Sequence, residues 1–287
     1  MVIKMKNRKI VTNIILYAVL ICMFIITVFP LIYTISASFK SNMEILTRPG
    51  TLFPEKPTLD NYIQAWTSES FCVPVLLKNS IIYTVISMVS MVLVSAMAGY
   101  VFARGNFKFK KLIFGCFTAL MFIKTGGITI YATFKVLTTL HLDKSLYALM
   151  FVNLFKIPII YIYLVKGNVE TIPFAIDEAA KMDGCSFIGT FFEIILPLMK
   201  PILATIAILS FNGSWNDYLL PNIFTLTIPT QRTLIVGLMA LKTTGEAASS
   251  WNLMLAGASI AMLPVLVAFA FGNRYFVKGV AAGAVKG

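Results

Sequence analysis

The stretch Glu178-Ala179-Ala180-Lys181-Met182-Asp183-Gly184, followed by Ile194-Ile195-Leu196-Pro197, decides how this chain is organised. It lies within residues 166–200, a polar segment between two long apolar runs. Alanine is the strongest helix former and adds little bulk, and glycine permits the left-handed turn that often ends a helix. The stretch therefore predicts a short helix that ends near Gly184, between two membrane-spanning regions.

The composition indicates a membrane protein. Of the 287 residues, 58% are hydrophobic and 13% are charged, whereas soluble domains carry about 25% charged residues. A helix needs about 20 consecutive apolar residues to cross the hydrocarbon core of a bilayer. Six runs reach or approach this length: Ile10–Ser36, Ser80–Ala103, Leu112–Leu137, Ser145–Val165, Pro201–Pro221 and Trp251–Phe271. We expect an all-α polytopic membrane protein with six transmembrane helices, the first of them too long to be a signal peptide.

The positive charges predict the orientation of the chain. More than half of the 24 Lys and Arg residues fall in four regions, at 1–9, 104–111, 166–200 and 273–287. Six alternating spans place these regions on one side, and cytoplasmic loops carry such an excess. We therefore expect a multi-pass protein of the cell membrane with both termini in the cytoplasm. The net charge of +12 follows from this asymmetry, so we expect lipid contacts and no nucleic-acid partner.

Motifs for enzyme chemistry are missing from the sequence. No G-x-x-x-x-G-K-[ST] stretch is present to cradle ATP phosphates. The single histidine, His141, and the four cysteines show no spacing typical of a metal or redox site. We therefore predict that the chain is not an enzyme and holds no metal or other cofactor. If transport is ATP-driven, ATP and Mg²⁺ must bind to another chain.

The polar stretch resembles the cytoplasmic loop of ABC importer permeases. Its pattern is Glu-Ala-Ala, three residues, a glycine, nine residues and Ile-x-Leu-Pro. Four further stretches are similar to the smaller permease of maltose-type carbohydrate importers: Phe211–Pro221, Thr233–Leu238, Trp251–Ala256 and Arg274–Gly287. The resemblance implies a type I importer permease that carries a sugar or oligosaccharide. It also implies three kinds of partner, namely a second, larger permease, an ATPase dimer and an extracellular solute-binding protein.

The resemblance further assigns roles along the chain. The expected parts are an N-terminus at 1–9, a peripheral first helix at 10–38, an outer loop at 39–79, a transport core at 80–272 and a tail at 273–287. The loop at 166–200 lies within the core and forms the coupling helix, which sits in a groove of the ATPase. Coupling is assigned to Asp177, Glu178, Ala179, Ala180, Met182, Asp183 and Gly184. From the residues alone, an interfacial helix-turn-helix is the alternative.

Polar residues inside the apolar runs are candidates for the solute path. Asn212, Ser214, Trp215 and Asn216 lie in the fifth run. An aromatic face with amides suits a sugar ring, although such residues also join helices to one another. Lys124 and Lys156 lie within the third and fourth runs. An intramembrane lysine costs about 2.5–3.5 kcal/mol and is a candidate functional residue.

Several explanations of the two lysines stay open. They can face a watery cavity, pair with a carboxylate of the companion permease, attract an anionic solute, or reach an interface with their long side chains. A permease for an acidic or phosphorylated sugar-like solute is therefore an alternative function. A secondary transporter is a further alternative, but it should show inverted halves and carboxylates near the midplane, and the sequence shows neither.

Overall fold

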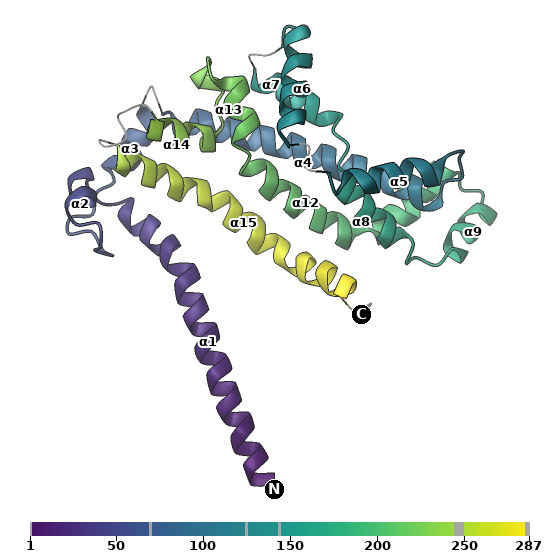
Figure 1. The fold of residues 1–287 in the computed structure, drawn as a ribbon, viewed down its shortest axis with the longest axis horizontal. Coiled ribbons are helices and arrows are strands. Elements are labelled where there is room, and N and C mark those ends of the chain that lie inside the picture. Colours follow the sequence, from purple (N-terminus) through teal and green to yellow (C-terminus); the bar gives the residue numbers. More distant parts are fainter. Residues whose placement is uncertain (1, 69–70, 124–125, 143–144, 244–249, 285–287) are drawn as a thin grey trace. The chain divides into compact units, whose positions relative to one another are not determined.

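The computed structural model describes residues 2–68, 71–123, 126–142, 145–243 and 250–284, and the regular elements of these ranges are all helices (Figure 1). The chain divides into two compact units, residues 1–73 with 238–262 and residues 74–237 with 263–287. The first unit holds α1 (Val2–Ala37), α2 (Asn42–Thr47), α3 (Asp60–Thr67), most of α14 (Leu234–Thr243) and the first part of α15 (Trp251–Ala284).

The second unit contains the long helix α4 (Val73–Arg104), apart from its first residue, and the end of α15. Its other elements, in chain order, are α5 (Lys110–Leu120), α6 (Gly126–Thr139), α7 (Leu146–Leu154), α8 (Ile159–Val169), α9 (Ala175–Met182), α10 (Phe187–Gly189), the π-helix η1 (Thr190–Ile195), α11 (Leu196–Leu198), α12 (Lys200–Trp215), α13 (Leu219–Thr225) and the 3-10 helix η2 (Pro229–Gln231).

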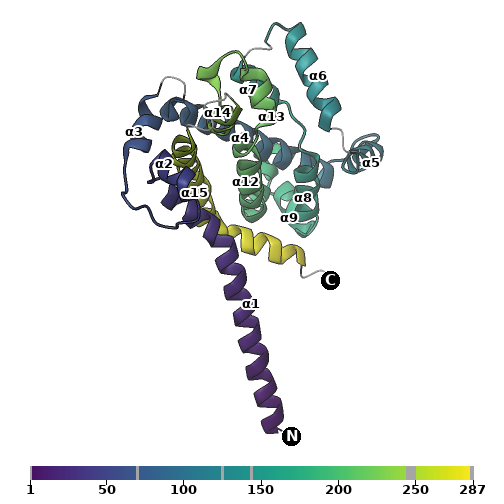
Figure 2. The same ribbon diagram turned by 60° about the vertical axis from the view of Figure 1, so that its left-hand side comes forward.

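Helix α1 has the surface of a lipid-facing span. It is one long helix (Figure 2), and no residue in its most apolar window, within Thr12–Ala37, is buried. Exposed apolar side chains such as Phe24 favour hydrocarbon over water. Only the end of the helix is held by the following segment, where the Tyr33 hydroxyl donates to the Pro49 carbonyl at 2.6 Å.

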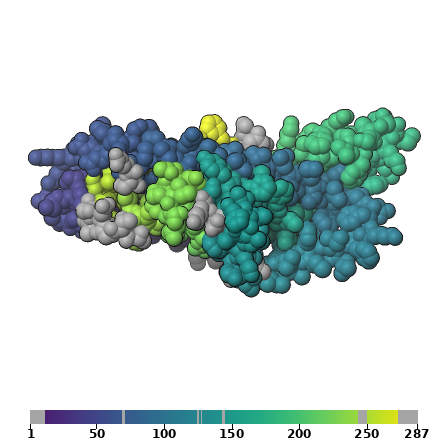
Figure 3. Space-filling view, turned by 90° about the horizontal axis from the view of Figure 1, so that it is seen from above, coloured from purple at the N-terminus to yellow at the C-terminus, as the bar shows by residue number. Residues whose placement is uncertain are grey.

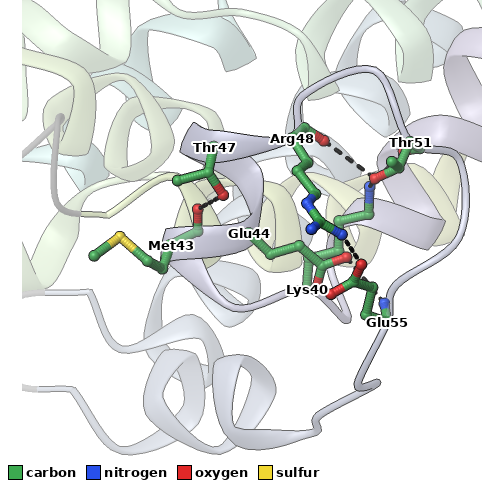
Figure 4. Close-up of polar contacts among 7 residues, drawn as sticks. All are labelled: Lys40, Met43, Glu44, Thr47, Arg48, Thr51 and Glu55. Carbon is green, nitrogen blue, oxygen red and sulfur yellow. Dashed lines mark hydrogen bonds and ion pairs between the residues drawn. The ribbon is translucent and has the colours of Figure 1, made fainter.

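The segment after α1 is held by polar contacts of its own (Figure 4). Lys40 is fully buried, and its ammonium group donates to the carbonyl oxygen and to the hydroxyl of Thr51. Arg48 and Glu55 form an ion pair across the same turn. The outer loop expected at 39–79 contains the short helix α3. Helix α2 is a second helix, capped by the Ser41 hydroxyl, which accepts from the Glu44 amide at 3.2 Å.

The apolar runs form spans with two departures from expectation. Within the described residues, Thr12–Ala37, Val73–Arg104, Leu146–Val169 and Trp251–Gly272 are long and apolar enough to cross a bilayer, and the pair Phe187–Leu198 with Lys200–Trp215, bent by 77°, makes up to five. The expectation of a continuous third span is wrong, because α5 ends at Leu120 and α6 begins only at Gly126. Residues 121–123, which follow α5, form a turn and a bend instead of helix. In addition, α15 continues through most of the expected tail, to Ala284.

Helix α4 is the centre of packing in the second unit. Near its Arg104 end, a buried cluster joins it to α8, η1 and α12 through residues Ala96, Tyr100, Val165, Val169, Phe191, Ile195, Met199 and Ile206. Toward its other end, Tyr83 packs with α6, α7 and α13. A Cβ atom at Gly99 would lie 2.5 Å from a Val165 methyl group, so only glycine allows α4 and α8 to approach this closely.

Candidate coupling site and polar cavity

Helix α9 is the short helix that the sequence predicts. Asp177 and Glu178 lie in its first turn, where acidic side chains stabilise the helix dipole. The helix ends at Met182, and Gly184 then takes a φ of +85°, the left-handed conformation that glycine adopts without steric cost. The next helix, α10, begins at Phe187 and is capped by Ser186, whose hydroxyl accepts from the Gly189 amide at 3.0 Å. The predicted turn at Gly184 is therefore present.

The assigned coupling residues divide between two faces of α9. Glu178, Ala179, Met182, Asp183 and Gly184 are exposed, Met182 to 88%. Ala180 is 3% exposed, and the side chain of Asp177 is 11% exposed, so both face the protein. Residues three apart lie on one side of a helix, which explains the pairing of positions 177 and 180. Figure 3 shows the surrounding segment, in green, at the molecular surface.

Arg104, the last residue of α4, holds the inner face of this segment. Its Nε lies 2.9 Å from Oδ2 of Asp177, and both side chains are about nine-tenths buried. One terminal nitrogen donates to the Ile172 carbonyl at 2.6 Å, and the guanidinium carbon lies 5.4 Å from the centre of the Phe174 ring. Sequence reasoning counted Arg104 only as a topology signal. Its ion pair with Asp177 was not predicted, because the two residues are far apart in the chain and only packing brings them together.

A cavity of about 540 Å³ opens beside this ion pair. Its walls include Tyr100, Phe174, Lys181 and Phe187 together with the ion-paired residues. The Tyr100 ring lies 4.7 Å from that of Phe187 and 5.1 Å from that of Phe191, measured between ring centres. Residues 172–191, here called the coupling segment, are thus held on both sides of Gly184 by the C-terminal end of α4.

A second, polar cavity of about 340 Å³ lies within the second unit. Its lining includes Tyr83, Asn153, Lys156, Ser210, Ser214 and Asp217. The Tyr83 hydroxyl donates to Oδ2 of Asp217 at 2.7 Å. A polar cavity among apolar helices can hold water or the hydroxyl groups of a solute.

The structure brings together two of the six candidate path residues. Lys156 and Ser214 share the polar cavity. Asn212, Trp215 and Asn216 are not among its walls: the Asn216 amide donates to Oδ1 of Asn212 at 3.0 Å, and Trp215 is buried and stacked on Phe211. Their contact with a solute stays a prediction. Lys124 lies outside the described residues.

Lys156 lies where the fourth span is interrupted. It falls between α7 and α8, just before Pro158, which cannot donate a backbone hydrogen bond. Its side chain also lines two adjoining cavities. None of the ion pairs found in the described part of the chain includes Lys156. Nothing in the sequence indicated that Tyr83 and Asn153 line the same cavity as Lys156. Asp217 could have been noticed, because it is an acidic residue near the end of the fifth apolar run.

These features define a helical membrane protein with an exposed short helix, α9, between its apolar spans. Residues 50–282 match the family described as binding-protein-dependent transport system inner membrane component, and the chain belongs to this family. The expected permease fold is thereby confirmed.

Two relatives match almost end to end. The inner membrane ABC transporter permease protein YcjP of Escherichia coli strain K12 is 32% identical, over 98% of this chain and 99% of the relative. The galactooligosaccharides transport system permease protein GanQ of Bacillus subtilis strain 168 is also 32% identical, over 100% of both chains. A crystal structure of a bacterial ABC transporter involved in the import of the acidic polysaccharide alginate has a similar fold, with a TM-score of 0.75 and 23% identity, over 91% of this chain and 95% of that chain.

Proposed function

We propose that this chain is a permease subunit of an ATP-driven importer for a sugar or oligosaccharide. The observation that carries the proposal is α9, a helix between apolar spans whose outer face, including Met182, is left exposed. Such a face suits docking to an ATPase subunit. Similarity along the whole chain to a galactooligosaccharide permease supports the sugar class.

The complete importer then contains further chains. A second, larger permease would complete the solute path, an ATPase dimer would bind ATP and Mg²⁺, and an extracellular binding protein would deliver the solute. The positive charges at 1–9, 104–111 and 166–200 support a cytoplasmic location for both termini and for α9.

The polar cavity is the part of the path that this chain contributes. It combines one ammonium group, from Lys156, with one carboxylate, from Asp217. Tyr83, Asn153 and Ser214 add neutral groups that donate and accept hydrogen bonds. The two charges balance, and this mixture fits the many hydroxyl groups of a neutral sugar. An acidic sugar is the second candidate, because Lys156 has no carboxylate ion-paired to it in the described residues.

Uptake into proteoliposomes tests both candidates. The chain is reconstituted with its companion permease, the ATPase and the binding protein, and uptake of a neutral oligosaccharide is compared with that of an oligosaccharide containing uronic acids. We expect ATP-dependent uptake of the neutral compound. Preferential uptake of the acidic one would favour the second candidate, and failure to import either would contradict the sugar class.

Ser214→Ala tests whether the cavity lies on the path. Loss of one hydrogen bond to the solute costs about 0.5–1.5 kcal/mol, so we expect uptake to fall roughly two- to tenfold with assembly unchanged. Ser95→Ala is the matched control, because Ser95 is also a buried helical serine but bonds only to backbone of its own helix. Equal uptake by the two variants would remove the cavity from the path.

A further inference from the structure

The last turn of α4 is joined to the coupling segment at separate points on either side of Gly184. Before the glycine, Arg104 contacts the Ile172 carbonyl, the Phe174 ring and the Asp177 carboxylate. After it, the Tyr100 ring packs in a tilted arrangement against the rings of Phe187 and Phe191. Tyr100 and Arg104 are four residues apart and therefore lie on one face of α4.

These contacts connect the coupling segment to α4, a helix that is not adjacent to α9 in the sequence. Along the chain, α9 follows α8 and precedes α10, whereas α4 lies far earlier in the sequence. The ion pair is nine-tenths buried on both sides, so water screens it little. Removal of one partner leaves a buried charge without compensation, which is strongly unfavourable.

The fork of Arg104 gives the link two separate contacts. A guanidinium group presents several donors in one plane, and here different nitrogens reach the Asp177 carboxylate and the Ile172 carbonyl. A lysine has a single charged nitrogen and cannot reproduce this arrangement. Displacement of α9 relative to α4 would break both contacts together.

We propose that Arg104 and Asp177 form a clasp that makes α4 and the coupling helix move as one body. Arg104 is a positioning residue: it acts through Asp177, and it transmits the displacement of α9 to a helix that lines the polar cavity through Tyr83. This inference rests on the proposed function, in which α9 docks to an ATPase.

The number of solute molecules imported per ATP hydrolysed tests the clasp in the reconstituted complex. For Arg104→Gln we expect this ratio to fall at least fivefold, while hydrolysis stimulated by the binding protein stays within twofold of wild type. Arg104→Lys should give an intermediate ratio. The matched control is Arg48→Gln, which breaks the exposed Arg48–Glu55 pair in the segment after α1 and should leave the ratio unchanged.

A covalent link should replace the ionic one. In a variant without the native cysteines, Arg104→Cys with Asp177→Cys should be uncoupled, and a short flexible thiol cross-linker should restore at least half of the wild-type ratio. An unchanged ratio in the Arg104 variants, or a cross-link that blocks import, would overturn the clasp. A wild-type complex without hydrolysis stimulated by the binding protein would instead overturn the proposed function.

Discussion

Gly184 shows how a single backbone conformation shapes the coupling site. Its φ of +85° turns the chain between α9 and the following helix, and a Cβ atom added to this glycine would meet no atom beyond its chain neighbours within 4 Å. The conformation, rather than crowding within the chain, therefore requires glycine. The turn at Gly184 was predictable from the sequence, because the glycine directly follows a short, polar, helix-forming stretch between two apolar runs.

Replacement of Gly184 by valine should uncouple import from ATP hydrolysis. A left-handed conformation costs an L-residue about 1–2 kcal/mol, and a β-branched side chain resists it most. We expect the turn to rearrange and the import per ATP to fall severalfold. Gly167→Val is the control, because Gly167 has equally open surroundings but no positive φ. Normal coupling in the Gly184 variant would argue against a role for this turn.

At the scale of elements, the sequence predicts helices from neighbouring residues better than it predicts contacts between residues that are far apart in the chain. Helix α9 and the first, second, fourth and sixth spans follow from runs of similar residues, which the sequence displays directly. The interruption between α5 and α6 was missed because the apolar residues on both sides of it together form one run long enough to span a bilayer. The Arg104–Asp177 pair and the Tyr83–Asp217 hydrogen bond were missed because each joins residues far apart in the chain that only packing brings together.

Because α1 is exposed, the effect of a charged substitution on its membrane insertion should depend strongly on how deep in the membrane the substituted residue lies. Phe24→Lys places a charge in the middle of the span Thr12–Ala37, in whose most apolar window no residue is buried. Such a charge costs about 2.5–3.5 kcal/mol at the centre of a span, so we expect membrane insertion of α1 to fall strongly. Ile14→Lys lies near the start of the span Thr12–Ala37, where lysine can reach the interface, and should insert nearly normally. Insertion is measured by glycosylation mapping, and equal insertion of the two variants would contradict a spanning α1.

At the scale of the whole molecule, the proposed orientation places Cys72 and Cys185 on opposite sides of the membrane. Cys72 precedes α4 and Cys185 follows α9, and each is partly exposed. In intact cells, a variant that retains only Cys72 should react with a membrane-impermeant thiol reagent. A variant that retains only Cys185 should react only after the inner face is opened. The reverse pattern would invert the proposed topology.

Cross-linking from α9 to the ATPase tests the central claim most directly. Single cysteines are placed at Met182, which is 88% exposed, and at Ala180, which is 3% exposed, in a variant without the native cysteines. In the assembled complex, the Met182→Cys variant should cross-link to the ATPase chain in high yield, and the Ala180→Cys variant should not. Absence of any cross-link from Met182→Cys in a complex that still imports solute would contradict the assignment of α9 as the coupling helix.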